Sequence, residues 1–290
     1  MSGKSRAALI LSLLAGLLLI APSPPVRATF PGTNGKIAFD DYVGSEHIFT
    51  VNPDGSDATD LTPGFEAASP AWSPDGTKIA FEVFLGPPGN GIWVMDADGS
   101  NKLQLTDDGG TEPSYSPDGS RIVYILGTGL VVMRADGTHR RLIVHQLNPS
   151  DPEFSPDGTT IAYTKGGSIW VVPRNGRGPH AITTGNYDSS PSWSPDGTRI
   201  AFQRTGFGPH NEDVWIMNAD GTNATNVTAN LMDANIFQEP AWSPDGTKLA
   251  IQRNPDCYSG GLITINVDGT GEAGVFCLYD ARNFAWQSLP

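Results

Sequence analysis

The stretch Pro70-Ala-Trp-Ser-Pro-Asp-Gly-Thr-Lys-Ile-Ala-Phe81 decides the fold, because versions of it recur along the chain. Four more copies begin at Pro113, Pro152, Pro191 and Pro240. The serine of the motif lies at positions 73, 116, 155, 194 and 243, so the repeats are 43, 39, 39 and 49 residues apart. A period near forty residues, with one aromatic residue and one tight turn in each unit, is typical of a β-propeller blade.

Each copy is expected to form a β-hairpin. A short strand ends at the aromatic residue, Pro-Asp-Gly makes the turn, and an apolar strand such as 78–81 follows. Proline sets φ at the first corner of such a turn, and glycine takes the positive φ that follows. A third strand then leads to a second tight turn, which begins at Asp54, Asp98, Asp136, Asn175, Asp220 or Asp268 and continues with glycine. With an outer strand after that turn, each unit has four strands.

Six units predict an all-β, six-bladed propeller with four antiparallel strands per blade. The segment 36–39 is a sixth copy of the second strand and lacks a first strand before it, whereas 284–290 resembles a first strand with no turn after it. We expect these two segments to pair and close the ring, which removes exposed sheet edges. One aromatic residue per blade is expected to pack between neighbouring sheets: Trp72, Tyr115, Phe154, Trp193, Trp242 and Trp286.

The first 28 residues have the pattern of a signal peptide. Lys4 and Arg6 precede an apolar run from residue 7 to residue 20, and Val26-Arg27-Ala28 offers small residues at the −3 and −1 positions. We expect cleavage after Ala28 and export of residues 29–290 as a single propeller domain; the alternative is an uncleaved N-terminal anchor. The protein is then periplasmic, in the cell envelope or secreted, and its mature chain has no membrane span.

The mature chain is strongly acidic. Without residues 1–28 it holds 15 basic and 31 acidic residues, which gives a formal net charge of −16. Such a surface repels nucleic acid and anionic lipid, and it favours cations or a basic partner. The same charge also keeps an exported protein soluble. We expect a monomer that binds a protein or peptide, with no role for nucleic acid.

The repeats resemble the WD40-like propeller repeat of the TolB family. The resemblance rests on Pro-x-Trp-Ser-Pro-Asp-Gly-x-x-Ile-Ala-Phe, on the segment from Ile92 to Gly99 and on the Leu-Thr at the end of the outer strand, and it covers essentially the whole mature chain. TolB-like proteins are similar in being exported, and their propellers bind partner proteins in the cell envelope. The resemblance therefore implies a protein-binding or scaffolding module. The α/β domain that precedes the propeller in the TolB pattern is missing from this sequence.

Strand alternation places the variable loops on one face of the propeller. The turns after the first and third strands are short, whereas three loops on the opposite face are long and span residues 85–91, 205–213 and 254–261. Variable loops on a rigid scaffold are common binding sites, although they also vary where nothing constrains them.

Acidic residues precede the innermost strands on the same face: Glu66, Glu112, Asp151, Asp188, Glu239 and Asp280. One carboxylate per blade predicts a ring at the mouth of the central channel. Such a ring can hold a cation such as Ca²⁺ or receive the basic side chains of a partner segment. The alternative is a solvated acidic rim.

Two cysteines, Cys257 and Cys277, lie in the last repeat. In an oxidising compartment they are expected to form a disulfide on the loop-rich face, and two buried thiols are the alternative.

Catalytic motifs of the Gly-x-Ser-x-Gly and His-Glu-x-x-His types are absent from the sequence, and the five histidines, His47, His139, His145, His180 and His210, are scattered. A lone loop histidine is usually solvated, so no residue is assigned a catalytic or cofactor-binding role. The rival to a binding module is a metal-assisted propeller enzyme, a lyase or hydrolase, with its site at the acidic channel mouth.

Overall fold

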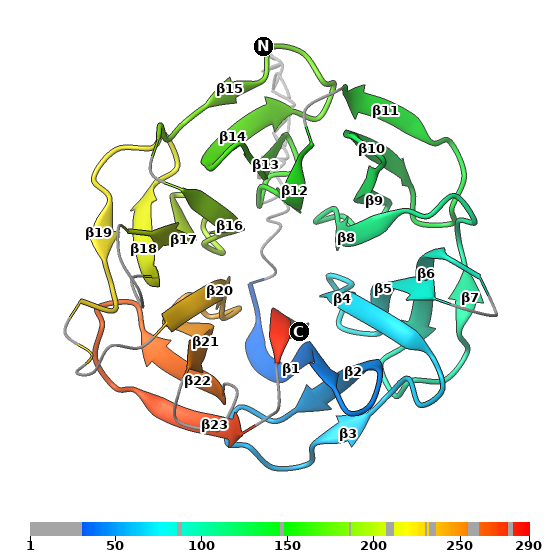
Figure 1. Ribbon diagram of the computed structural model, residues 1–290, viewed down its shortest axis with the longest axis horizontal. Helices are drawn as coiled ribbons and strands as arrows, with labels where there is room; N and C mark the ends of the chain where they lie inside the picture. The colour runs from blue at the N-terminus through cyan, green and yellow to red at the C-terminus, as the bar shows by residue number, and fades with distance from the viewer. Residues whose placement is uncertain are drawn as a thin grey trace, which may run out of the picture.

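A computed structural model describes residues 31–85, 89–145, 148–185, 187–206, 212–229, 231, 236–254, 261–277 and 281–290. In these ranges the chain forms six four-stranded antiparallel sheets, which stand as blades around a central channel (Figure 1). The predicted six-bladed propeller is therefore confirmed.

Every blade has its innermost strand beside the channel and its outermost strand at the rim of the ring (Figure 1). From the channel outward, blade 1 contains β24 (Arg282–Leu289), β1 (Thr33–Tyr42), β2 (Glu46–Val51) and β3 (Thr59–Asp60). In the same order, blade 2 contains β4 (Glu66–Trp72), β5 (Lys78–Leu85), β6 (Gly91–Asp96) and β7 (Leu103–Gln104). Blade 3 contains β8 (Thr111–Tyr115), β9 (Arg121–Leu126), β10 (Gly129–Arg134) and β11 (Arg141–Val144). Blade 4 contains β12 (Ser150–Phe154), β13 (Thr160–Lys165), β14 (Ser168–Pro173) and β15 (His180–Ala181). Blade 5 contains β16 (Asp188–Trp193), β17 (Arg199–Thr205), β18 (Glu212–Asn218) and β19 (Thr225–Asn226). Blade 6 contains β20 (Ile236–Trp242), β21 (Lys248–Asn254), β22 (Gly261–Asn266) and β23 (Ala273–Cys277).

The C-terminal strand closes the ring, as the sequence predicts. β24 lies against β1 beside the channel, with Trp286 opposite Ile37 and Ala285 opposite Ala38 (Figure 1). Blade 1 thus combines one strand from the end of the chain with three from the beginning. Its stability depends on both ends, because the innermost strand comes from a segment more than 200 residues away in sequence.

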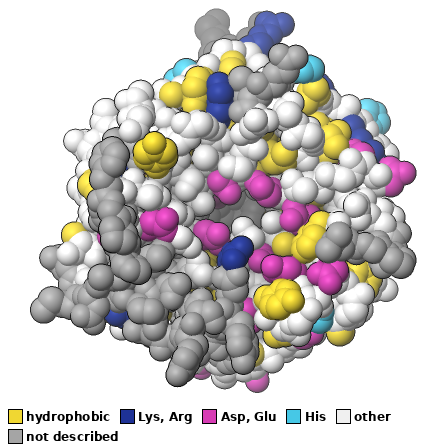
Figure 2. All heavy atoms as spheres, in the orientation of Figure 1, with side chains coloured by type: hydrophobic (Ala, Val, Ile, Leu, Met, Phe, Trp, Pro, Cys, Tyr) yellow, Lys and Arg dark blue, Asp and Glu magenta, His cyan; other side chains and the backbone are white. Residues whose placement is uncertain are grey.

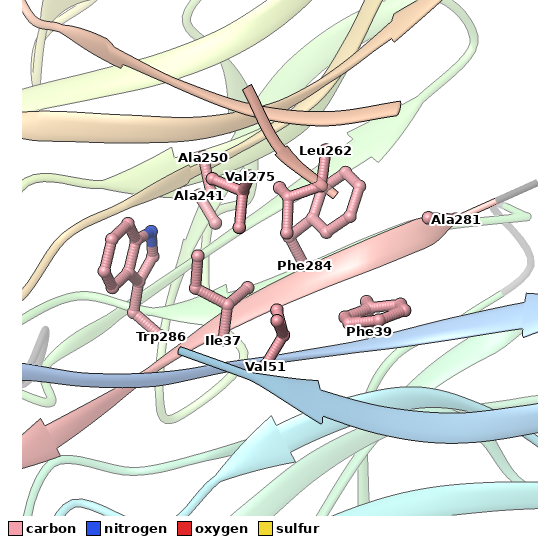
Figure 3. Packing of buried hydrophobic residues seen from close by; sticks show 10 residues of the cluster. All are labelled: Ile37, Phe39, Val51, Ala241, Ala250, Leu262, Val275, Ala281, Phe284 and Trp286. Atoms are coloured by element: carbon pink, nitrogen blue, oxygen red, sulfur yellow. The ribbon is translucent and has the colours of Figure 1, made fainter. Parts of the chain in front are cut away.

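The aromatic residue that ends each innermost strand fills the seam between two blades. Trp286 of blade 1 belongs to one buried cluster with Ala241, Ala250 and Leu262 of blade 6 (Figure 3). The equivalent residues Trp72, Tyr115, Phe154, Trp193 and Trp242 lie in the five other core clusters, and all six side chains are buried. The core is therefore six similar seams rather than one central core, as expected for a repeat protein.

Tight turns connect the strands on the face opposite the long loops. In the Ser-Pro-Asp-Gly turn at residue 73, the Ser73 hydroxyl donates to Asp75 (2.6 Å), and the Asp75 carboxylate accepts from the Thr77 amide (3.1 Å). These hydrogen bonds hold the pKa of the Asp75 carboxyl below its usual value against the opposing effect of burial. The same contacts recur in the other four copies, so the turns on this face are short and tightly hydrogen-bonded.

The predicted signal peptide, residues 1–28, falls outside the described residues. In the described ranges, no helix has the length and hydropathy needed to cross a lipid bilayer.

Candidate functional site at the channel mouth

Each innermost strand contains a β-bulge at the same position. In β4, Ser69 and Pro70 stand opposite the single residue Phe81 of β5. The same register shift occurs in β8, β12, β16, β20 and β24. In five of the six strands the second bulged residue is proline, which has no amide hydrogen to give to the ladder and is therefore tolerated at a bulge.

The first residue of each bulge has a left-handed backbone conformation. We call these six residues the channel ring; their φ values lie between 51° and 54°, and they are Ser69, Glu112, Asp151, Ser190, Glu239 and Asn283. Non-glycine residues rarely adopt this conformation, which costs on the order of 1–3 kcal/mol at each site. Six repetitions of such a conformation require a compensating interaction in the ring.

That interaction is hydrogen bonding of the ring amides to acidic side chains of the preceding blade. The Ser69 amide donates to Asp40 (3.0 Å), the Glu112 amide to Glu82 (2.7 Å) and the Asp151 amide to Glu112 (2.5 Å). The Asn283 amide donates to Glu239 (2.5 Å). Each bond joins two blades, so the acidic residues contribute to ring closure as well as to the charge of the channel.

Residues of the channel ring surround a cavity of about 210 Å³. The cavity runs from the ring to five of the six seam aromatics, and its lining includes the further carboxylate Glu153. None of the described residues that line it is Lys, Arg or His. Asp and Glu side chains gather around the central hollow in the face seen in Figure 2. The described lining of the cavity is therefore acidic and contains no basic side chain, although a Lys or Arg side chain lies beside the hollow in Figure 2.

Burial raises the pKa of several carboxyl groups at and around the channel. Burial raises the pKa of Glu112 to about 8, and the nearby charge of Asp151 adds to the rise. Burial likewise raises the pKa of Glu153 to about 8, although the Trp193 amide donates to it. The pKa of Asp40 lies well above its usual value because its side chain is buried. The channel thus holds protons near neutral pH that a bound cation can displace.

Comparison with known proteins identifies the type of propeller. Residues 121–256 match the TolB beta propeller domain. The matched part of the propeller is TolB-like. The Tol-Pal system protein TolB 1 of Novosphingobium aromaticivorans is 36% identical over 84 residues, which are 28% of this chain and 18% of that protein. The aligned part is thus less than a fifth of that relative's length.

Solved structures share the fold. TolB from Acinetobacter baumannii matches with a TM-score of 0.76 at 20% identity, over 88% of this chain and 67% of that chain. An oligogalacturonate lyase in complex with manganese matches with a TM-score of 0.52 at 16% identity, over 84% of this chain and 73% of that one. At these identities, both likenesses concern the fold alone. In the part of the TolB-like propeller that the structure describes, no three His, Cys, Asp or Glu side chains are grouped as metal ligands.

Three of the six carboxylates predicted from sequence belong to the channel ring: Glu112, Asp151 and Glu239. Glu66 lies at the outer end of β4, three residues before the ring position, and its carboxylate accepts from the Glu46 amide (3.4 Å). Asp188 is fully buried and bound to the guanidinium of Arg204 at 2.6 and 3.0 Å. Asp280 lies outside the described residues. A ring of one carboxylate per blade is therefore not what the described residues form.

Sequence reasoning missed the other ring members of the TolB-like propeller, Ser69, Ser190 and Asn283. The signal was present, because every ring residue stands three positions before the seam aromatic. The prediction also placed the carboxylates before the innermost strands, whereas these strands begin earlier and contain the bulge. The offset from the aromatic residue, not acidity, identifies the channel position.

The long loops that were expected to carry binding residues lie largely outside the described ranges, as does His210. Cys257 also lies outside them; the backbone of Cys277 belongs to β23, but its side chain is not described. The disulfide therefore stays a prediction.

Proposed function

We propose that the protein is an exported, TolB-like binding module whose channel mouth receives a basic segment of a protein or peptide partner. The observation that carries the proposal is the channel ring: Glu112, Asp151 and Glu239, together with Glu153, face a cavity that has no basic residue in its described lining. A Lys or Arg side chain entering the cavity meets several carboxyl groups, of which Glu112 and Glu239 are held in place by backbone amides. Its positive charge favours loss of the protons that burial keeps on Glu112 and Glu153.

The charge of the whole molecule supports the same partner. A net charge of −16 without residues 1–28 attracts a basic segment over a long range and speeds its association at low salt. Export rests on residues 1–28, which have the signal-peptide pattern, and mature protein that begins at Thr29 would support it. The binding role also agrees with what the TolB resemblance implies.

A basic side chain suits the ring better than a bare metal ion. Ca²⁺ takes six to eight oxygen ligands, whereas no trio of His, Cys, Asp or Glu in the described ranges is placed as a metal-ligand set. A hydrated Ca²⁺ remains a second occupant to test, because carboxylates that repel one another bind either kind of cation.

The test is binding of a synthetic oligolysine peptide, followed by fluorescence anisotropy at several NaCl concentrations. We expect salt-sensitive binding that Glu112→Gln with Glu239→Gln weakens at least about tenfold, since each lost contact to a desolvated charge removes about 1.5–3 kcal/mol. The control is Asp98→Asn with Asp220→Asn, which removes two charges from the turn face; the equivalent turn of blade 4 already contains Asn175. Equal affinities for the two double variants would reject the channel mouth as the site.

The same proteins test Ca²⁺. Thermal unfolding is compared in CaCl2 and in NaCl of equal ionic strength. A larger rise in melting temperature with CaCl2, lost in the Glu112→Gln, Glu239→Gln protein, would place a cation in the ring. Identical melting curves in the two salts would remove Ca²⁺ from the proposal.

A further inference from the structure

Three side chains of blade 1 form a hydrogen-bonded series on the loop-rich side, away from the channel. The Ser45 hydroxyl lies 2.8 Å from Nε2 of His47. Nδ1 of His47 lies 2.8 Å from Oδ2 of Asp60. Ser45 lies in the turn between β1 and β2, His47 in β2 and Asp60 in β3. The order hydroxyl, Nε2, Nδ1, carboxylate is that of a serine nucleophile with its base and orienting acid.

The carboxylate decides which imidazole nitrogen holds the proton. An ionised Asp60 can only accept, so Nδ1 of a neutral His47 donates to it, and Nε2 is left to accept from the Ser45 hydroxyl. Asp60 is itself fixed, because its other oxygen accepts from the Thr62 amide at 3.0 Å. The His47 ring stacks on Phe49, and its side chain is 12% exposed. The base is therefore held in one tautomer and one orientation.

The blade does not need this arrangement in order to fold. The residue that aligns with His47 just before the buried apolar residue of the third strand is Gly91, Gly129, Ser168, Asp213 or Gly261 in the other blades. Capping by the residue at the Asp60 position does recur, because Asn226 accepts from the Thr228 amide in blade 5 (2.9 Å). The repeat thus explains the carboxylate, but it does not explain the serine and the histidine.

The surroundings of Ser45 leave room for a substrate. A side chain added at Gly44 would meet no atom within 4 Å, so the space beside the turn is open. Tyr42 and Val43, next to it, are 52% and 50% exposed and offer an apolar surface. Among the described residues, none accepts a hydrogen bond from the Gly44 or Ser45 amide. A developing oxyanion could therefore accept hydrogen bonds from these two amides.

We propose that Ser45 is a catalytic nucleophile, with His47 as its base and Asp60 as a positioning residue, and that this site hydrolyses uncharged esters with a small apolar acyl group. Acidic neighbours, Glu46 beside Ser45 and Glu66 bonded to the Glu46 amide, disfavour anionic substrates. This activity is independent of the channel, and neither proposal depends on the other.

The reaction uses water and no cofactor. Ser45 Oγ forms a bond to the acyl carbon while its proton moves to Nε2 of His47. The bond from the acyl carbon to the alcohol oxygen breaks, and the leaving alkoxide takes the proton from His47. Water then attacks the acyl-serine, again giving a proton to His47; the acyl carbon–Oγ bond breaks and Oγ recovers that proton. The products are one acid and one alcohol, and the enzyme is unchanged.

A fluorophosphonate probe followed by intact-mass and peptide-mass spectrometry tests the nucleophile. We expect one adduct per chain, located on Ser45, and hydrolysis of p-nitrophenyl acetate with a burst of about one equivalent. Ser45→Ala should abolish both, and His47→Gln should slow labelling by about 10²–10⁴-fold through loss of the base. Asp60→Asn should slow labelling at least about tenfold, while its amide oxygen keeps the bond to the Thr62 amide, as Asn226 does in blade 5.

The matched control is Ser56→Ala. Ser56 is exposed in the same blade and donates to Asp54 (2.7 Å), so its loss should leave labelling unchanged. Melting curves of all variants check that they fold. We expect only small shifts in melting temperature, because the other blades carry different residues at the aligned positions. A wild-type protein that takes no label, or a Ser45→Ala or His47→Gln protein labelled at the wild-type rate, would overturn the proposal and leave the three residues a brace for the hairpin.

Discussion

The carboxylate of Glu112 accepts a hydrogen bond from the backbone amide of Asp151 at 2.5 Å and so joins blade 3 to blade 4 beside the channel. The Glu112 amide in turn donates to Glu82 of blade 2 (2.7 Å). One residue therefore links three blades, and its left-handed φ of 51° points its amide and side chain to different neighbours. Because the same residue is half-buried and close to Asp151, ionising it is unfavourable in the folded state.

The first prediction concerns pH. The folded-state pKa of Glu112, about 8, is above the ordinary value of 4.5, so the native state binds more protons than the unfolded state between these values. The free energy of unfolding should therefore fall as pH rises from about 4.5 to about 8 and should change little from this group outside that window. Glu112→Gln removes the titration and keeps an acceptor for the Asp151 amide. Urea unfolding at pH 5, 6, 7 and 8 should give a flatter dependence for the variant.

Part of the slope will remain in that variant, because the pKa of Glu153 is also raised to about 8. The control is Asp98→Asn, since hydrogen bonds from Ser100 lower the pKa of Asp98, which is therefore ionised throughout this window. A Glu112→Gln protein with the same pH dependence as wild type would mean that Glu112 is ionised in the native state at pH 7.

The second prediction concerns the closing strand. Trp286 is 6% exposed and packs in the seam between blades 1 and 6, whereas Leu289, three residues further on, is 38% exposed (Figure 3). Trp286→Ala should destabilise the protein by about 3–5 kcal/mol through loss of buried area and cavity formation. Leu289→Ala should cost about 0.5 kcal/mol or less. Chemical denaturation of both variants measures the difference.

Deletion of residues 284–290 should be more severe than either substitution, because β1 loses its partner strand and the ring opens. A truncated protein that melts within about two degrees of the parent would contradict closure by β24.

Repetition explains how much of this architecture could be predicted from sequence. Each Ser-Pro-Asp-Gly turn is a local signal. Six aromatic residues at the same position of the repeat indicate which side chains pack between the blades, without knowledge of any long-range contact. Closure follows because 36–39 lacks a first strand and Trp286 lacks a turn after it. These features depend on local turns and on burial, which short segments of sequence carry.

The channel site was predicted only in part, because its geometry depends on a backbone feature that acidity does not report. Glu66 and Asp188 have the right charge, but they lie three and two residues before the ring position of their strands. The bulge places its first residue in the lining of the channel, whether that residue is Glu112 or Ser190. Asp188 is held away from the channel ring by Arg204, which lies opposite it on the neighbouring strand. No local sequence pattern indicates such a pairing between strands.

The third prediction tests that pairing. Asp188 has no exposed surface, and Arg204, which holds it, also lies over the rings of Trp215 (4.7 Å) and Phe202 (5.0 Å). Asp188→Ala leaves a largely buried guanidinium without its partner and should destabilise the protein by about 3–5 kcal/mol. The exposed pair of Lys78 and Asp96, at 2.7 Å, is the control, and Lys78→Ala should cost about 0.2–1 kcal/mol.

Binding separates this structural role from the channel. Oligolysine affinity of folded Asp188→Ala protein should equal that of wild type, whereas an affinity loss like that of the Glu112→Gln, Glu239→Gln protein would put Asp188 back among the binding residues.

The last prediction concerns Cys257 and Cys277. The backbone of Cys277, the last residue of β23, pairs with that of Gly261, the first residue of β22, and Cys257 precedes Gly261 by four residues in the sequence. A disulfide between them would close about twenty residues and stabilise the protein by about 3 kcal/mol on the chain-entropy model. Thiol titration of the unreduced, denatured protein should therefore find none, and reduction should lower the melting temperature. The Cys257→Ser, Cys277→Ser protein should melt like the reduced wild type and be insensitive to reductant. Two titratable thiols in the unreduced protein would instead mean that the strand pairing of β22 and β23 alone holds this edge of blade 6.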